Sequence, residues 1–429
     1  MSDAHIHDLV DHFFRHQSAK LAAVLTRVFG LQNLELVEDV VQSALVEALE
    51  VWKIRGVPEN PAAWMYRVAR NKALDVIRRQ QVADRFGPEW VLWRETTSGP
   101  AQIDRLFLAN EIADSQLRMI FACCHPQLPE ESQISLALKT LCGFSTAEIA
   151  RALLTTETNA KKRVARAKRK FLDKEVEFEV PAGDALKARL DSVHSVLYLL
   201  FNEGYSSSHP DELIRRDLCA EAMRLCLFLF NHPASRNPET PALLALMLLH
   251  AARFDARLDE SSNILLLEEQ DRTRWNREII AQGVYYLNES ASGSRVSRYH
   301  LEAAIAAEHS LAPTFPGTNW RAILTLYDDL IRIYPSPIHE LNRAIALAQI
   351  AGSDAGITAI RGIRDLDSLD DYHLLHATLG EFHRRAGRLD EARRCFLRSM
   401  ECTVSLSEQR LLERKLHNCD ALAESMRGE

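Results

Sequence analysis

Residues 61–79 read PAAWMYRVARNKALDVIRR, and this stretch has the most informative residue pattern of the sequence. Proline is well suited to a first helical turn, so a helix is predicted from Pro61. At 3.6 residues per turn, one stripe of this helix is apolar and predicted to be buried: Ala62, Met65, Ala69, Ala73 and Val76. A second stripe, roughly opposite, combines an aromatic ring with cations and an amide: Trp64, Arg67, Asn71 and Arg78.

The second stripe has two interpretations. Trp64 could pack under a neighbouring element while the charged residues are simply solvated. Alternatively, the stripe could bind opened DNA, with cations on the phosphates and the aromatic ring beside an unpaired base. The spacing alone does not decide between the two.

The sequence just before this helix makes the pattern more specific. EDVVQSALVEALEVW at 38–52, followed by NPAAWMYRVARNKALDVIRR at 60–79, resembles the second conserved region of extracytoplasmic-function sigma factors. The resemblance implies that one segment docks on the clamp of RNA polymerase: Asp39, Gln42, Leu45 and Val46. It also implies that the loop at 55–60 and the helix at 61–79 hold the promoter −10 element through Arg55, Asn60, Trp64, Arg67, Asn71, Lys72, Arg78 and Arg79.

A second motif lies at 145–171, which reads STAEIARALLTTETNAKKRVARAKRKF. Ser145 followed by Glu148 is a capping box, and this predicts a short helix that buries Ile149 and Leu153 and stops around Leu154. Thr155 or Thr156 can cap the next helix. That helix has a core-facing stripe of Ala160, Val164, Ala167 and Phe171, and seven of the ten residues 161–170 are Lys or Arg. Two short helices with a basic second one indicate a helix-turn-helix.

The same segment resembles the fourth conserved region of these sigma factors, which reads the −35 element. The resemblance implies DNA contacts from Thr158, Asn159, Lys161, Lys162, Arg163, Arg166 and Lys168. Taken alone, the motif fits an ordinary helix-turn-helix regulator equally well, and a basic solvated helix is a further alternative. The order of the two motifs favours the sigma factor, because a repressor has no need for a strand-melting helix.

The remaining sequence predicts an all-α chain in several parts. We expect sigma region 2 at 1–80, a linker at 81–113, sigma region 4 at 114–175 and a helical domain at 186–429. The last domain is predicted to be tetratricopeptide-like, because a pattern of small and large apolar residues recurs after 36 residues: Ala344, Leu347, Gly356 and Ile360 become Gly380, His383, Ala392 and Phe396. Residues 196–208, VLYLLFNEGYSSS, resemble the start of such an extension in a subgroup of these factors.

Charge and composition are compatible with this assignment. The net charge is −7, but residues 1–185 carry 24 basic and 25 acidic residues, against 28 and 34 in the remainder. Local basic stripes, not the sum, attract phosphates. The adjacent Cys123 and Cys124 are predicted to be buried thiols and not metal ligands, and isolated histidines such as His250, His309 and His376 are predicted to be packed.

The function predicted from these patterns is promoter-directed transcription initiation without covalent chemistry. No Walker loop, HExxH, GxSxG or GxGxxG pattern supports an enzyme, and a catalytic role for Glu203 or Tyr205 is not favoured. We expect no cofactor and no metal. Core RNA polymerase (β′ clamp and β flap) and promoter DNA are the expected partners, with a regulatory protein or an intramolecular contact through the C-terminal domain left open. Without a signal peptide or membrane span, a cytoplasmic protein is expected. The rivals are a helix-turn-helix regulator without sigma activity and a helical-repeat scaffold.

Overall fold

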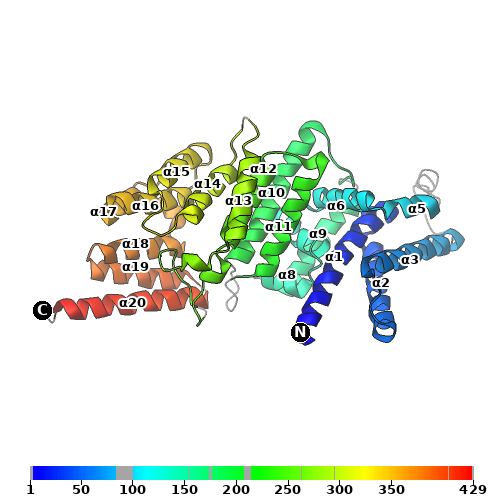
Figure 1. The fold of residues 1–429 in the computed structure, drawn as a ribbon, viewed down its shortest axis with the longest axis horizontal. Coiled ribbons are helices and arrows are strands. Elements are labelled where there is room, and N and C mark those ends of the chain that lie inside the picture. Colours follow the sequence, from blue (N-terminus) through cyan, green and yellow to red (C-terminus); the bar gives the residue numbers. More distant parts are fainter. Residues whose placement is uncertain are drawn as a thin grey trace. The chain divides into compact units, whose positions relative to one another are not determined.

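The computed structural model describes residues 3–83, 100–153, 155–172, 176–206, 214–261, 263–293, 295–403 and 405–427 (Figure 1). Within these ranges the chain forms helices and no β-strand; the one extended pairing is an isolated bridge between Leu258 and Ile264. The prediction of an all-α fold is confirmed. The chain divides into two compact units, Met1–Leu199 and Leu200–Glu429.

The first unit begins with three long helices, α1 (Asp3–Phe29), α2 (Leu34–Arg55) and α3 (Pro61–Ala83), with a short 3-10 turn η1 (Leu31–Asn33) after α1. α1 packs on α2, and α2 packs on α3. Leu25 of α1, Ala44 of α2 and Met65 of α3 are fully buried in the core that these helices share. Gly56 ends α2 with a φ of 79°, a conformation that glycine adopts without steric cost.

The buried stripe predicted for residues 61–79 is present in α3. Met65, Ala69 and Ala73 have no exposed surface, and Ala62 and Val76 at its two ends are half-buried. Three central positions with small or flexible side chains let α3 lie close to the other helices of the bundle.

The linker expected at 81–113 is in part helical. Residues 84–99 lie outside the described ranges, but α5 (Pro100–Leu106) and the start of α6 (Ala109–Cys123) fall inside the stretch predicted to be without helices. α5 packs on α3, buries Ile103 and Leu106, and pairs Asp104 with Arg70 at 2.6 Å. A seven-residue helix is too short to show a sustained hydrophobic period, which is why the sequence pattern missed it.

Four helices follow in the same unit: α6, α7 (Glu130–Thr140), α8 (Thr146–Ala152) and α9 (Glu157–Leu172). Cys123 and Cys124 are buried where α6 ends, as predicted for packed thiols. Burial raises the pKa of both thiols, that of Cys124 to about 12. Both cysteines are therefore protonated core residues at neutral pH.

α10 (Gly183–Tyr205) runs from the first unit into the second. Its first half is tied to the preceding helices, since Arg189 donates to the Phe121 carbonyl at 3.0 Å and Ser192 donates to Gln133 Oε1 at 3.1 Å. These bonds tie α10 to α6 and α7 up to Ser192, and the first unit as a whole extends to Leu199.

The second unit continues with a series of helices, the longest described connection being the one between Ala251 and Arg277, which contains two 3-10 turns. The helices are α11 (Arg216–Asn231), α12 (Glu239–Ala251), α13 (Arg277–Ser290), α14 (Arg298–Leu311), α15 (Trp320–Ile333), α16 (Pro337–Ala351), α17 (Ser353–Arg361), α18 (His373–Arg385), α19 (Leu389–Cys402) and α20 (Leu406–Arg427). The 3-10 turns are η2 (Pro233–Ser235), η3 (Phe254–Ala256), η4 (Arg272–Arg274) and η5 (Leu366–Leu369). From α11 to α20, consecutive helices pack against one another.

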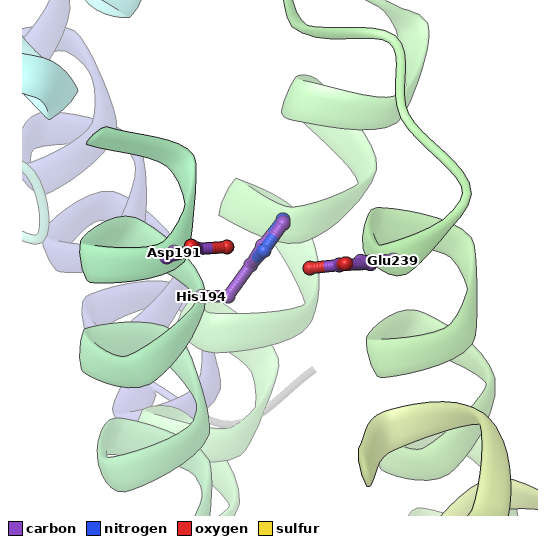
Figure 2. A group of neighbouring side chains, drawn as sticks. All are labelled: Asp191, His194 and Glu239. Carbon is purple, nitrogen blue, oxygen red and sulfur yellow. The ribbon is translucent and has the colours of Figure 1, made fainter. Parts of the chain in front are cut away.

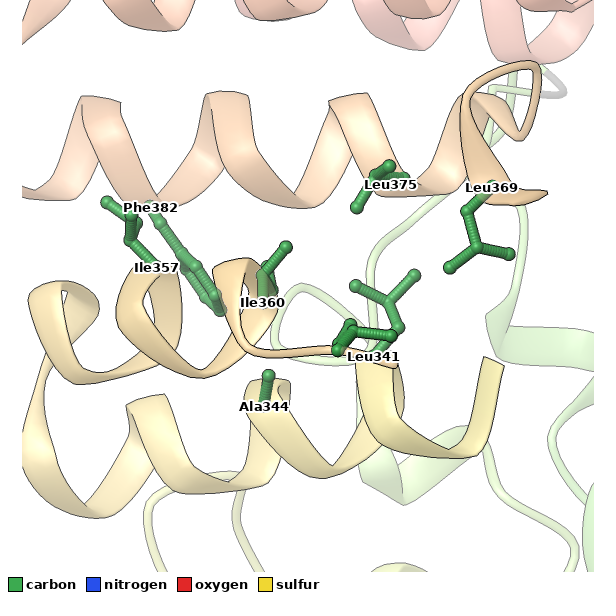
Figure 3. Close-up of a cluster of buried hydrophobic side chains, with 8 residues drawn as sticks. Leu341, Ala344, Ile357, Ile360, Leu369, Leu375 and Phe382 are labelled. Atoms are coloured by element: carbon green, nitrogen blue, oxygen red, sulfur yellow. The ribbon is translucent and has the colours of Figure 1, made fainter. Parts of the chain in front are cut away.

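The predicted repeat falls on two helix pairs, α16–α17 and α18–α19. Figure 3 shows the core between them, in which Leu341 and Ala344 of α16 face Ile357 and Ile360 of α17 and Phe382 of α18. The small residues of the repeat lie at close helix approaches: a Cβ on Gly380 would stand 2.6 Å from the Phe396 ring. The tetratricopeptide assignment itself stays a prediction. Among the described residues, no helix has the length and apolar character needed to span a bilayer.

Candidate nucleic-acid interface

The helix-turn-helix geometry is built by two capped helices. Ser145 Oγ accepts from the Glu148 backbone N–H at 3.2 Å while the Glu148 carboxylate accepts from the Ser145 N–H at 2.7 Å, which is the predicted capping box at the start of α8. Thr156 Oγ1 accepts from the Asn159 N–H at 3.2 Å at the start of α9. Leu154, the predicted stop of the first helix, lies outside the described residues.

α9 has one apolar and one basic face. Ala160, Val164, Ala167 and Phe171 are buried, as the spacing predicted, and α9 packs through them on α7 and α8. Four of the residues expected to contact DNA are exposed: Thr158, Asn159, Lys162 and Arg166. The two cations among them, Lys162 and Arg166, form no ion pair with any described residue. Lys161 is also exposed and pairs with Glu157 one turn back at 2.8 Å.

The remaining two residues of this predicted set, Arg163 and Lys168, form ion pairs with other helices. Arg163 pairs with Glu131 of α7 at 2.9 Å, and Lys168 pairs with Glu38 of α2 at 2.8 Å. Both cations are less than a quarter exposed. Of the seven residues assigned to the −35 element, these two are the least accessible in this conformation.

On α3, the predicted aromatic residue is half-buried. The Trp64 ring meets the Trp52 ring of α2 edge-on, with 5.5 Å between centroids, and Trp52 stacks on Phe14 of α1. Trp64 is thus both a packed residue and part of the stripe that carries Arg67 and Asn71, which are exposed. The geometry accommodates both interpretations of this side chain.

The other residues assigned to the −10 element differ in accessibility. Lys72 is half-buried and pairs with Glu47 of α2 at 2.8 Å, while the exposed Arg78 lies 3.4 Å from Asp75. Asn60 Oδ1 accepts from the Ala63 N–H at 3.0 Å and so caps α3. Arg55, at the end of α2, and Arg79, near the end of α3, are exposed.

The surface of α2 carries the residues expected to bind the polymerase. Asp39, Gln42 and Val46 are exposed at offsets of 0, 3 and 7, and Leu45 is half-buried. Leu49, which is not among the residues predicted from the sequence, continues this stripe with 56% of its surface exposed. Its position one turn after Leu45 was the signal that could have identified it. Exposed apolar residues beside an acid and an amide are typical of a protein-binding helix face.

Comparisons with protein-family models divide the chain in the same way. Residues 13–82, which cover most of α1 with α2 and α3, match the model described as Sigma-70 region 2. Residues 118–171, which end with the helix-turn-helix, match Sigma-70, region 4. The chain belongs to the sigma-70 family. With region 2, region 4 and a C-terminal extension in this order, it is a sigma factor of the extracytoplasmic-function type.

The extension of this sigma factor matches a family of unknown function (DUF6596) over residues 189–291. A curated relative, an uncharacterized protein from Rhizobium meliloti (strain 1021), is 36% identical over 405 residues, which cover 94% of this chain and 95% of the relative. The similarity therefore spans regions 2 and 4 and the helices after them. Core RNA polymerase and promoter DNA are the partners that the two sigma regions imply.

Among the described residues, two neighbouring side chains of α10 are of types that can bind a metal ion. Asp191 and His194 lie three residues apart on α10, the first exposed and the second buried; Figure 2 draws them with Glu239, the first residue of α12 in the other unit. Two side chains on one helix do not constitute a site.

Tyr205 is held by arginines. Arg253 donates to its hydroxyl, Arg257 donates to its carbonyl oxygen, and the Arg257 guanidinium lies 3.9 Å from the ring centroid. Burial would raise the pKa of Tyr205, but the charges of Arg253 and Arg257 outweigh burial and lower it. The same burial and charges lower the pKa of the neighbouring His250 to about 3, so this histidine is packed and neutral. The cluster closes the end of α10 onto α12 and η3.

Proposed function

We propose that this sigma factor directs core RNA polymerase to specific promoters and promotes strand opening there. Asp39, Gln42, Leu45 and Val46 of α2 bind the polymerase clamp. The loop before α3 and the outer stripe of α3 hold the −10 element, and α9 lies in the major groove of the −35 element. The observation that carries the proposal is the two-sided α9, whose apolar face is fully buried on α7 and α8 while Lys162 and Arg166 project outward.

In this proposal the protein performs no covalent chemistry. A melted non-template strand that binds more tightly than the duplex shifts the opening equilibrium by the difference in affinity. Exposed Arg67 and Asn71 beside the Trp64 ring are suited to an unpaired strand, since cations bind phosphates and aromatic rings stack on bases. Because polymerase and promoter DNA are the partners, we place the protein in the cytoplasm.

The decisive experiment is run-off transcription with core polymerase, first on the DNA upstream of the protein's own gene. We expect a discrete transcript that depends on this protein. A helix-turn-helix regulator would bind duplex DNA without polymerase and start no transcript, and a helical-repeat scaffold would leave no promoter footprint. Either result would overturn the proposal.

We further propose that the second unit controls this activity through a partner protein or through the sigma regions. The excess of acidic residues in the C-terminal part and the basic stripes of α3 and α9 motivate the proposal. Because α10 is bonded to α6 and α7 up to Ser192, a truncation should end after Leu199 and not at residue 186. Unchanged transcript yield together with unchanged core binding by the truncated chain would remove the idea.

A further inference from the structure

The second unit contains a cavity of about 270 Å³, and none of the residues assigned to promoter recognition lines it. Its walls come from α15, α16, the end of α14 and the loop at 266–268, with Arg385 of α18 at its edge. Two ion pairs with later helices hold this loop: Arg385 of α18 pairs with Glu268 at 2.7 Å, and Arg414 of α20 pairs with Glu269 at 3.3 Å.

The apolar part of the cavity is largely aromatic. The Trp320 ring meets the Phe315 ring edge-on at 5.2 Å and the His309 ring edge-on at 5.3 Å, and Tyr327 lies two turns further along α15. All four rings are half-buried, so each keeps part of its surface toward the cavity. Rings set at steep angles to one another leave flat faces against which another planar ring can stack.

The polar part comes from one face of α16. Asn342 and Gln349 are two turns apart, both line the cavity, and neither makes a hydrogen bond to any other described residue. This face differs from the one with Leu341 and Ala344 that packs in the core of Figure 3. Carboxamides offer both donors and acceptors, and half-buried amides without partners leave hydrogen-bonding capacity for a ligand.

The charges at the cavity cancel. Arg385 donates two hydrogen bonds to Glu268, at 2.9 and 2.7 Å, and also pairs with Glu381 at 2.9 Å. Burial, with the charges of Arg253 and Arg272, lowers the pKa of His309 to about 3, so that ring is neutral at physiological pH. An ion entering the cavity would lose water without meeting an unpaired opposite charge.

We propose that this cavity binds a small uncharged planar molecule whose edge carries amide-like donors and acceptors. Its ring stacks among Phe315, Trp320 and Tyr327, and its edge pairs with Asn342 and Gln349. The site is separate from the residues assigned to polymerase and DNA, so it provides the extension with a ligand input of its own. The proposal does not depend on promoter recognition and is tested by binding alone.

The test uses the full-length chain and two probes, nicotinamide and adenine, followed by ligand-observed NMR and titration calorimetry. We expect at least one of them to bind. Benzoate, which is planar but anionic, and cyclohexanecarboxamide, which carries the amide on a puckered ring, should bind about tenfold more weakly. Failure of both planar probes, or equal affinity for either comparison compound, would overturn the proposal.

Variants locate the binding. Asn342→Ala with Gln349→Ala should weaken the probe about tenfold, and Asn342→Asp with Gln349→Glu, which keeps the side-chain size and removes the amide donors, should weaken it as well. Gln282→Ala is the matched control, because Gln282 is an exposed amide of α13 in the same unit and should leave affinity unchanged. Circular dichroism and the unfolding temperature verify that each variant is folded. Undiminished affinity in both double variants would contradict the proposal.

Discussion

Lys168 of α9 reaches Glu38 of α2, with 2.8 Å between its Nζ and the Glu38 Oε2. The pair joins region 4 to region 2, and only 18% of the lysine side chain is exposed. Lys168, which is assigned to binding the −35 element, is therefore already paired with Glu38. Glu38 directly precedes Asp39, which is assigned to binding the polymerase. DNA bound by Lys168 has to displace Glu38.

Replacing Glu38 by Gln should strengthen binding to duplex promoter DNA, because Lys168 no longer has to leave an ion pair. A partly exposed pair stabilises by up to about 1 kcal/mol, so the expected gain is about two- to fivefold in affinity. Fluorescence anisotropy with a −35 duplex measures it. Glu35→Gln is the control, since Glu35 is exposed on the same helix and pairs with no described residue. Equal effects of the two substitutions would contradict the prediction.

Lys162→Ala and Arg166→Ala should weaken duplex binding and flatten its salt dependence. Both side chains are exposed and form no ion pair with the described residues, so their removal should weaken DNA binding and hardly change the free energy of unfolding. Each lost phosphate contact should reduce the slope of log affinity against log salt by about 0.9. Lys187→Ala, an exposed lysine of α10, should leave the slope unchanged. A slope that stays at its original value in the double variant would show that α9 does not lie on the phosphates.

Arg67→Ala with Asn71→Ala should impair strand opening while duplex binding is kept. Both residues are exposed on α3, so the unfolding temperature should not change. Holoenzyme binding to a fork-junction probe with a single-stranded −10 segment should weaken about tenfold. Trp64→Phe should lose less affinity for this probe than Trp64→Ala, because phenylalanine keeps a ring against Trp52 and for stacking on a base. Base stacking is worth about 1–3 kcal/mol. Equal losses on forked and fully paired probes would contradict the assignment of α3 to the melted strand.

Local features were predictable from the sequence where neighbouring residues determine them. The Ser145–Glu148 capping box and the buried stripe of α9 were predicted and are confirmed, because both depend on spacing within one or two turns. The short α5 was missed because seven residues show no sustained hydrophobic period, and because its burial depends on its contact with α3. The assignment of residues to DNA and to polymerase stays a prediction.

The ion pairs of the candidate interface could not be predicted. Lys168 and Glu38 are 130 residues apart, and Lys72 pairs with Glu47 across two helices. Helical periodicity indicates that a side chain points away from its own core, but it does not indicate which neighbouring element covers it. The same holds for Trp64, whose contact with Trp52 joins α3 to α2.

Gly380→Ala should destabilise the second unit although alanine favours helices. In an exposed helix the change would stabilise by about 0.5–1 kcal/mol, but here a Cβ would stand 2.6 Å from the Phe396 ring. Overpacking of this kind costs about 1–3 kcal/mol, so urea unfolding should show a net loss. Gly362→Ala is the control, because its nearest contact would be 3.4 Å. A Gly380→Ala variant as stable as the original chain would show that the α18–α19 approach can widen at no cost.

Glu381 should make the second unit sensitive to acid. Burial alone would raise the pKa of this carboxyl, but Arg384, Lys415 and Arg385 bind it and lower the pKa to about 2. A folded-state pKa below the unfolded value contributes stability above the unfolded pKa, and this contribution is lost as the pH falls from about 4.5 through about 2. The size of the shift corresponds to about 3 kcal/mol. Glu381→Gln should therefore lower the unfolding free energy at pH 7, and the difference from the original chain should shrink as pH falls through this range. A difference that is independent of pH would contradict the role of the ionised carboxylate.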